Sequence, residues 1–362
     1  MKVLHLSGAD VWGGNENQLA HFIQNSQLPE IENQVFCFEN TPIHRFVQKQ
    51  GIGVCGVPKS GSFSIRTSRA LADYVKSQKI DVVHIHTSNF LSTYMMADLL
   101  FKIPAKAVFS KKGISDASTW LSRLKYNYKG VAAYICVSEA VRKSFQPGLN
   151  SIRKKLVSVI YDGIPVSIGN NANEKPVKKE SSVKIIGSVA NHTDAKDLPT
   201  LIRSIGYLVH QLGRTDVELH QYGLESGLTP QLRQMVSDLK LENHVKFMGY
   251  REEIASAFDS FDISLISSQR EGGPVFLLES FKFRIPVVTT SVGIVPELLE
   301  ADHHAIIAET GDYEALARGV QYLLNNPQKA GNMATAARSL LERKLTIEHT
   351  ISQTLDLYKG LF

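Results

Sequence analysis

Short apolar runs of strand length alternate along the chain with longer segments of mixed apolar and polar residues. The earlier runs are Lys2–Ser7, Gln34–Phe38, Gly53–Val57, Asp81–His86, Ala105–Ser110, Ala132–Val137 and Leu156–Ile160. The later runs are Val183–Val189, Val217–Gln221, Val245–Met248, Ile263–Ile266, Val287–Thr290 and Ala305–Ala308. Apolar runs separated by helix-length segments are typical of parallel strands joined by helices. The pattern predicts two α/β domains, each built on a doubly wound parallel sheet.

A polar segment without periodicity separates the two series of runs. Residues 169–182 read GNNANEKPVKKESS, which is typical of a linker. We therefore expect an N-terminal domain over residues 1–168 and a C-terminal domain over residues 183–345. The last segment, about residues 346–362, predicts an amphipathic helix. Its apolar stripe consists of Ile347, Ile351, Leu355 and Tyr358.

Composition favours an ordinary globular protein, since 43% of the 362 residues are hydrophobic and 21% are charged. There is no run of about 18 apolar residues, and the first apolar run is too short for a signal peptide. We therefore expect a cytoplasmic protein. The cysteines, Cys37, Cys55 and Cys136, lie in apolar contexts and are predicted to be small buried hydrophobes rather than a disulfide framework or a zinc site.

The net charge of +5 is unevenly distributed. Residues 99–155 contain 12 lysines and arginines but only two acidic residues, Asp116 and Glu139. Within this region, Ser118–Lys129 mixes cations with Trp120, Leu121, Leu124, Tyr126 and Tyr128. Such a segment suits peripheral contact with an anionic membrane or a lipid-linked acceptor. The alternative is a normal solvated helix edge, and no sequence pattern of a nucleic-acid-binding motif accompanies the charge.

The segment after residue 266 carries the strongest chemical signal. Glu271 precedes a Gly272-Gly273-Pro274 turn that opens an apolar helix, and such a helix start can hold a phosphate. Glu279 lies about two turns into that helix, where a buried carboxylate needs partners. The two hydroxyls of a ribose could supply them. Alternatively, Glu279 is a surface residue or pairs with Lys282.

These residues resemble the retaining glycosyltransferases of family 4, which have the GT-B fold. The shared elements are Glu271 and Glu279 at their spacing, the segment Pro286–Thr289, and the turn containing Gly293, Pro296 and Glu297. The resemblance implies two Rossmann-like domains facing across a cleft, with the nucleotide sugar bound by the C-terminal domain and the acceptor mainly by the N-terminal one. It also implies that the last helix crosses back onto the first domain.

The resemblance further assigns roles to single residues. Glu271 would contact the hydroxyls of the transferred sugar, and Glu279 would hold the ribose. Sugar and phosphate would contact Gly272, Gly273, Pro274, Val275 and Phe276.

In the first domain, two short segments resemble family elements. Gly13 and Gly14 resemble the Gly-Gly loop near the donor diphosphate, although a glycine turn needed only for backbone geometry is the alternative. His86 matches the second histidine of the family's Asp-Val-Val-His-x-His segment, which implies a catalytic position beside the reacting sugar. We interpret His84 as a core histidine, because no carboxylate or third ligand follows closely enough to suggest a metal.

In the second domain, residues 187–197 resemble the family's phosphate loop. Lys196 matches its lysine and could neutralise charge on the leaving diphosphate; alternatively, it is a surface residue that begins a helix. Asn191 stands at the position of the family's arginine. Tyr250 and Arg251 are expected near the base.

Two further departures from the family pattern lie beside the donor pocket. Arg284 stands where the family has a glycine after the helix, and Ile294 replaces the second glycine of the later turn.

Together these features predict transfer of a sugar from a nucleoside diphosphate sugar, a UDP-sugar first among them, to a glycan or lipid-linked hydroxyl. No Asp-x-Asp occurs in the sequence, so the reaction is expected to need no metal and no other cofactor. The alternatives are a sugar-nucleotide epimerase of similar fold, a non-catalytic sugar-binding protein, or an inactive family member.

Overall fold

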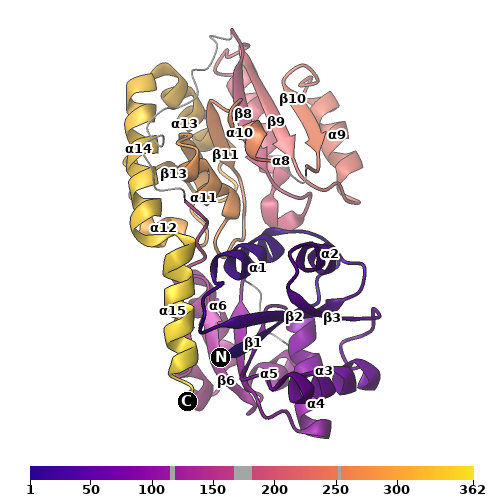
Figure 1. Ribbon diagram of the computed structural model, residues 1–362. Coiled ribbons are helices and arrows are strands. Elements are labelled where there is room, and N and C mark those ends of the chain that lie inside the picture. The colour runs from indigo at the N-terminus through magenta and orange to yellow at the C-terminus, as the bar shows by residue number, and fades with distance from the viewer. Residues whose placement is uncertain (115–118, 167–181, 252–253) are drawn as a thin grey trace. The chain divides into compact units, whose positions relative to one another are not determined.

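The computed structural model describes residues 1–114, 119–166, 182–251 and 254–362. The chain divides into two compact units, coloured along the chain in Figure 1. Unit 1 consists of Met1–Pro165 with Thr346–Phe362, and unit 2 of Val166–Leu345. Apart from Ser182, the predicted linker 169–182 lies outside the described residues. Among those residues, no helix combines the length and apolarity needed to cross a bilayer.

Unit 1 alternates strands with helices. Its strands are β1 (Lys2–Ser7), β2 (Glu32–Phe38), β3 (Gly53–Val57), β4 (Val82–Ile85), β5 (Lys106–Lys111), β6 (Val131–Cys136) and β7 (Val157–Val159). Its helices are α1 (Gly14–Asn25), α2 (Pro42–Lys49), α3 (Ile65–Gln78), α4 (Ser88–Phe101), α5 (Trp120–Tyr126), α6 (Glu139–Phe145), η1 (Gln146–Gly148), α7 (Ser151–Lys154) and α15 (Ile347–Lys359). In the described part of unit 1, the strands form one parallel sheet in the order β3-β2-β1-β4-β5-β6-β7.

The two faces of this sheet bury different helices. Leu4 and Ile85 face a core that includes Leu71 of α3 and Tyr94 of α4. The alternate residues Val3, Val82 and Val108 face a second core formed with α1 and α15. The stripe Ile347, Ile351, Leu355 and Tyr358 of α15 is buried there, as its spacing predicts. The C-terminal helix therefore completes the core of unit 1.

Unit 2 repeats the alternation of strands and helices. Its strands are β8 (Lys184–Val189), β9 (Val217–Tyr222), β10 (Val245–Gly249), β11 (Ile263–Ile266), β12 (Val287–Thr290) and β13 (Ile306–Ala308). Its helices are η3 (Asp194–Lys196), α8 (Leu198–His210), α9 (Thr229–Asp238), α10 (Ala255–Phe258), α11 (Val275–Lys282), α12 (Val295–Leu298), α13 (Tyr313–Asn325) and α14 (Pro327–Lys344). Within the described ranges the strands form a parallel sheet ordered β10-β9-β8-β11-β12-β13.

Each sheet reverses its strand order at one point. In unit 1 the reversal lies between β1 and β4, and in unit 2 between β8 and β11. Ligands of open α/β sheets bind beyond the carboxyl ends of the strands at such reversals. The loops after these four strands are therefore the places to look for a site. Every predicted strand is present, with ends within two residues of the prediction.

Candidate functional site

Lys196 and Glu271 form an ion pair at the reversal point of unit 2. Lys196 ends the turn η3 after β8, and Glu271 lies in the loop after β11. Both side chains are largely shielded, with exposed fractions of 28% and 12%. The Ser268 hydroxyl also donates to Glu271 Oε1 at 2.9 Å. Two predicted catalytic residues therefore meet directly, and Lys196 precedes α8 rather than beginning it.

Side-chain and backbone hydrogen bonds hold the two loops together around this pair. The Ser267 hydroxyl donates to the backbone oxygens of Lys196 and Asp197 at 3.1 and 3.0 Å. Gln269 Nε2 donates to Asp197 Oδ2 at 2.9 Å, and Gln269 N donates to Ala195 O at 2.9 Å. Asp197 is held in the left-handed region, with φ of 46°, and its side chain caps α8 at Thr200 N. The position of Lys196 is thus fixed from both loops.

The turn after Glu271 is close-packed against the loop that follows β12. Gly293 has φ of 56°, and a Cβ there would lie 2.4 Å from Gly272 O. Only glycine fits at that point. Pro274, expected at the first helical position, is instead the N-cap of α11, and the helix begins one residue later, at Val275. The N–H groups of the first helical residues, Val275 and Phe276, have no carbonyl acceptor within the helix, because no earlier helical turn supplies one. They are therefore suited to binding an anion.

Glu279 lies partly buried on α11. Burial raises the pKa of its carboxyl to about 7, against the opposing effect of the Lys282 charge on the same helix. Among the described residues, the Glu279 carboxylate has no hydrogen bond or ion pair. A shielded carboxylate without a protein partner is a candidate for binding a ligand with paired donors.

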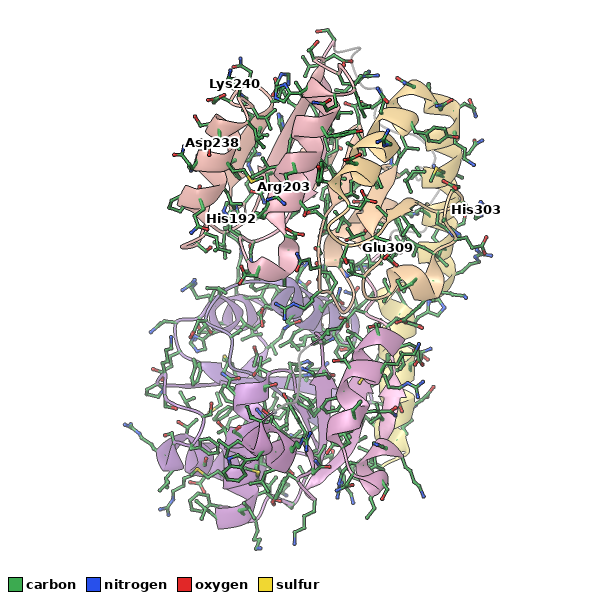
Figure 2. All side chains as sticks on the ribbon, turned by 180° about the vertical axis from the view of Figure 1, so that it is seen from behind. His192, Arg203, Asp238, Lys240, His303 and Glu309 are labelled. Atoms are coloured by element: carbon green, nitrogen blue, oxygen red, sulfur yellow. The ribbon has the colours of Figure 1, made fainter. Side chains whose placement is uncertain are left out.

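The loop after β8 is anchored to the end of β9. Asn191 Oδ1 accepts a hydrogen bond from Leu224 N at 2.9 Å. The buried His192, labelled in Figure 2, contacts Thr229 Oγ1 at 2.7 Å and Gln221 Oε1 at 2.8 Å. Asn191 thus contributes to the loop's backbone geometry and brings no positive charge to it. His192 went unnoticed in the sequence, where nothing marks it as a residue that supports the loop.

Tyr250 and Arg251 follow β10, the edge strand two places from β8. Tyr250 is 44% exposed. The Arg251 guanidinium lies over the Tyr222 ring, 5.2 Å from its centroid. Both residues are accessible at the carboxyl end of the sheet, where a nucleoside base could stack.

The two sequence departures are accommodated differently. Arg284 adopts φ of 53°, so a non-glycine residue takes the left-handed turn after α11. Ile294 is 1% exposed, and its Cγ2 would lie 3.8 Å from a Cβ on Gly273. Ile294 therefore packs behind the glycine turn.

In unit 1, the loops after β1 and β4 are also tied together. Gly8 N donates to Thr87 Oγ1 at 3.0 Å, and Asn89 Nδ2 donates to Gly8 O at 2.9 Å. Gly13 is the N-cap of α1 and Gly14 its first residue. The glycine pair therefore lies at the start of a helix at the reversal point.

Glu16 of α1 is a buried carboxylate that sequence reasoning missed. It is 6% exposed, and burial raises its pKa, while hydrogen bonds from its own and the Gly13 backbone N–H oppose the rise. Glu16 is the third residue of α1, and its carboxylate accepts a hydrogen bond from the backbone N–H of the N-cap residue Gly13, as in a capping box. The three-residue spacing between Gly13 and Glu16 is the sequence signal that could have identified Glu16.

His86 directly follows β4 and borders a small cavity. The cavity offers about 20 Å³ to the centres of water molecules, and its lining includes Gln18, His84, Lys112 and Asp162. The Lys112 ammonium pairs with Asp162 Oδ1 at 2.5 Å. No sequence motif marked Lys112 or Asp162.

The basic, aromatic segment divides into an exposed and a buried part. Trp120, Leu121 and Leu124 of α5 are 71%, 53% and 56% exposed. Tyr126 is buried, and Tyr128 donates to Asp98 Oδ2 at 2.6 Å. The tyrosines therefore belong to the interior and to its edge, contrary to the predicted surface role, whereas α5 presents an apolar face. Ser118 lies outside the described residues.

The sequence matches two family descriptions that lie end to end. Residues 12–168 match Glycosyltransferase Family 4, and residues 170–340 match Glycosyl transferases group 1.

Curated relatives and solved structures point the same way. The chain is 25% identical to N-acetyl-alpha-D-glucosaminyl L-malate synthase of Bacillus anthracis, over 93% of this chain and 88% of that protein. It is 30% identical to the amylovoran biosynthesis glycosyltransferase AmsK of Erwinia amylovora, over 48% of this chain and 44% of that protein. The crystal structure of Anabaena HepE with UDP and glucose superposes with a TM-score of 0.83 at 18% identity, over 99% of this chain and 100% of that one. The chain therefore belongs to the family 4, group 1 glycosyltransferases and has the GT-B fold.

Proposed function

We propose that this glycosyltransferase moves a sugar from a nucleoside diphosphate sugar to a hydroxyl, with retention of the anomeric configuration. The observation that carries the proposal is the Lys196–Glu271 pair beside the start of α11. A lysine, a row of helical N–H groups and two carboxylates are the groups needed to hold a diphosphate, a ribose and a sugar. HepE, whose crystal structure contains UDP and glucose, makes UDP the first nucleotide to test.

The donor would be held in three places. Its diphosphate would lie at the N–H groups of Val275 and Phe276 and draw the Lys196 ammonium toward it. Glu271, released from the lysine, would accept hydrogen bonds from the sugar. Glu279 would accept both ribose hydroxyls.

In the reaction, the bond between the anomeric carbon and the phosphate oxygen breaks and its electron pair leaves with the diphosphate. The acceptor hydroxyl bonds to the same face of the sugar, and its proton passes to the departing phosphate oxygen. Lys196 stabilises the negative charge that develops there. Because these groups can carry that charge, we expect transfer to continue in the presence of a chelator.

The acceptor would be a glycan or lipid-linked hydroxyl in surface polysaccharide assembly. The name of the Erwinia amylovora relative, an amylovoran biosynthesis glycosyltransferase, supports this setting. The exposed apolar face of α5, beside Arg123 and Lys129, supports peripheral contact with an anionic membrane, in which case the protein would act at the cytoplasmic side.

The thermal unfolding midpoint with UDP, GDP, ADP and NAD, each in excess, tests the proposal. A ligand of the native state stabilises it by RT ln(1 + [L]/Kd). A rise with one nucleoside diphosphate that is lost in Glu279→Ala is expected. A rise with NAD alone would favour the epimerase alternative. Nucleotide binding without transfer to any acceptor would favour a non-catalytic protein.

A further inference from the structure

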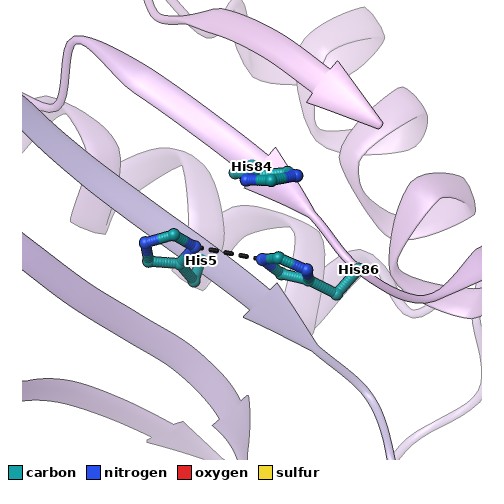
Figure 3. Close-up of side chains that lie close together, drawn as sticks. All are labelled: His5, His84 and His86. Carbon is teal, nitrogen blue, oxygen red and sulfur yellow. Dashed lines mark hydrogen bonds between the residues drawn. The ribbon is translucent and has the colours of Figure 1, made fainter. Parts of the chain in front are cut away.

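Three buried histidines of unit 1 lie side by side, as Figure 3 shows. His5 belongs to β1, His84 to β4, and His86 follows β4. The ring centroids of His5 and His86 are 5.3 Å apart, and those of His84 and His86 are 4.1 Å apart. We call these three residues the histidine row. All three rings are buried, and buried polar groups are as a rule hydrogen-bonded, so each of the six ring nitrogens should have a partner.

The direction of hydrogen bonding in the row is set by Asn33 of β2. Its Nδ2 donates to Ser26 Oγ at 2.9 Å and to Ser26 O at 3.3 Å. A backbone oxygen only accepts, so the amide nitrogen must face Ser26. Asn33 Oδ1 then faces His5 Nε2 at 3.0 Å. Because an amide oxygen also only accepts, His5 Nε2 carries the proton.

The remaining protons follow from burial. Burial lowers the pKa of His5 to about 4 and holds the pKa values of His84 and His86 well below the usual range. A neutral imidazole has one N–H, so His5 Nδ1 is an acceptor. It lies 3.0 Å from His86 Nε2, which must donate to it. His86 has then used its only proton. Its Nδ1 is left as a bare acceptor, buried and without a hydrogen-bond partner among the described residues.

A metal ion is the competing explanation, because the three rings offer ligand atoms within 4.8 Å of one another. The ring nitrogens of His84 already contact Tyr358 Oη at 2.5 Å and Ser110 Oγ at 2.7 Å. Five of the six nitrogens thus have partners in the described structure. A cation would have to displace these bonds, and no described carboxylate joins the group to balance its charge. Hydrogen bonding is the better account.

We propose that Asn33 and His5 are positioning residues that hold His86 in its Nε2–H tautomer, so that His86 Nδ1 accepts a hydrogen bond from a substrate hydroxyl. The cavity that His86 borders is of a size that admits one hydroxyl group or water molecule. Gln18 also lines it, and its Nε2, which has no hydrogen-bond partner in the part of the chain that the structure describes, can donate to the same oxygen. The inference rests on the proposed function, since it requires a sugar hydroxyl to arrive beside His86.

Nitrogen NMR of the protein with isotope-labelled histidine rings tests the tautomers directly. Protonated and unprotonated ring nitrogens differ widely in chemical shift, and His5→Gln and His86→Gln variants assign the signals. We expect Nε2–H on both His5 and His86. An Nδ1–H signal on His86 in the unaltered protein would overturn the inference. This measurement needs no turnover, so its result stands whether or not a nucleotide sugar is found.

Addition of a saturating nucleotide sugar, with and without acceptor, separates a substrate hydroxyl from water. We expect the His86 Nδ1 resonance to shift when the hydroxyl arrives. If the resonance is unchanged although the protein turns the substrate over, water alone occupies the cavity. That result would contradict the proposed hydrogen bond between a substrate hydroxyl and His86 Nδ1.

Asn33→Asp changes the amide to a carboxylate of nearly the same size. The new charge raises the His5 pKa, and the imidazolium then donates from Nδ1 into His86 Nε2, which forces the proton of His86 onto Nδ1. We expect kcat/KM to fall about tenfold at neutral pH and to recover as pH rises and His5 becomes neutral again.

Among the described residues, the other titratable groups near the row are Lys112, whose charge lowers the His84 and His86 pKa values, its ion-pair partner Asp162, and Tyr358 of α15. All three are present in the variant and in the unaltered protein, so the difference between the two pH profiles reports His5.

Ser26→Ala is the matched control. It removes one hydrogen bond of the Asn33 amide nitrogen but leaves the Ser26 backbone oxygen to orient it. Tautomers and kcat/KM should stay as in the unaltered protein. An Asn33→Asp loss that is independent of pH would show a structural defect and overturn the positioning role.

Discussion

The Lys196 ammonium lies against the Glu271 carboxylate, although 75 positions separate them in the sequence. Each residue neutralises the other in a shielded place that the loops after β8 and β11 define. A bound diphosphate would offer Lys196 more negative charge than one carboxylate does. Donor binding is therefore expected to exchange partners, so that Lys196 turns to the phosphate and Glu271 becomes available to the sugar.

Glu271→Gln and Lys196→Gln should each lower turnover by on the order of 10²–10³, since Lys196 acts on the charge that develops on the leaving diphosphate and Glu271 holds the transferred sugar. The double variant should lose less than the product of the single losses, because the two residues form one ion pair and act on the same donor molecule. Steady-state kinetics with the nucleotide sugar measure this. Arg318→Gln, which breaks the exposed pair with Glu314, is the control and should leave turnover unchanged. Fully multiplicative losses would mean that the two residues act independently.

Glu279 should make nucleotide binding depend on pH. Burial raises its pKa to about 7, so near neutrality the free protein is a mixture of the acid and the carboxylate. Only the carboxylate can accept both ribose hydroxyls, and affinity should rise between about pH 6 and pH 8. Calorimetry in buffers of different ionisation enthalpy should detect proton release near pH 7. In Glu279→Gln the affinity should be roughly 10–100-fold weaker and flat with pH. A pH-dependent affinity that survives in this variant would assign the titration to another group.

The same carboxyl should affect stability in the opposite direction. Its pKa is raised from 4.5 in the unfolded chain to about 7 in the folded protein. Between these values the folded state keeps the proton while the unfolded state has lost it, so stability falls as pH rises through this window. At 1.36 kcal/mol per pKa unit, the full effect is about 3 kcal/mol above pH 7.

Glu279→Gln should therefore gain stability relative to the unaltered protein as pH rises from about 5 to 8. Chemical denaturation of both proteins at each pH measures the difference, and subtraction removes the contribution of the other titrating groups. A constant difference would show that the carboxyl is ionised throughout.

The apolar face of α5 should support membrane binding. Trp120→Gln with Leu124→Gln replaces two largely exposed apolar side chains, 71% and 56% exposed. Sedimentation with anionic vesicles should show salt-sensitive binding that this variant loses, while neutral vesicles bind neither protein. Tyr322→Gln replaces an exposed aromatic residue of unit 2 and should bind as the unaltered protein does. If the α5 variant binds anionic vesicles as well as the unaltered protein does, the apolar face of α5 is an ordinary solvent-exposed helix face.

The strands could be predicted from the sequence because parallel strands are buried on both faces and therefore read as continuous apolar runs. The element from Glu271 to Glu279 could also be predicted, because its glycine turn and the helix after it are neighbours in the sequence. The contact between Lys196 and Glu271 could not, because it depends on how two loops are tied by Ser267 and Gln269.

The roles of Asn33 and His5 could not be predicted from the sequence for a similar reason. Each lies on a different strand, and neither belongs to a motif. Their relation to His86 depends on the parallel order β2-β1-β4 and on which side of the Asn33 amide faces Ser26. A tautomer is a property of a whole hydrogen-bond network, and no spacing along one strand encodes it.

Gly293 offers a way to disturb the donor loop without touching a charged group. A Cβ at this position would lie 2.4 Å from Gly272 O and 3.0 Å from Glu271 O. Gly293→Ala should therefore push the Glu271–Gly273 turn away, weaken nucleotide binding and lower turnover together. Gly311→Ala is the matched control in the same unit, because Gly311 also has positive φ, at 82°, but no atom of the described residues lies within 4 Å of the added Cβ. Both variants should lose about 1 kcal/mol of stability to the unfavourable φ, and only Gly293→Ala should lose nucleotide affinity as well. If the thermal shift with the nucleotide is the same in the two variants, the loop after β12 does not support the donor site.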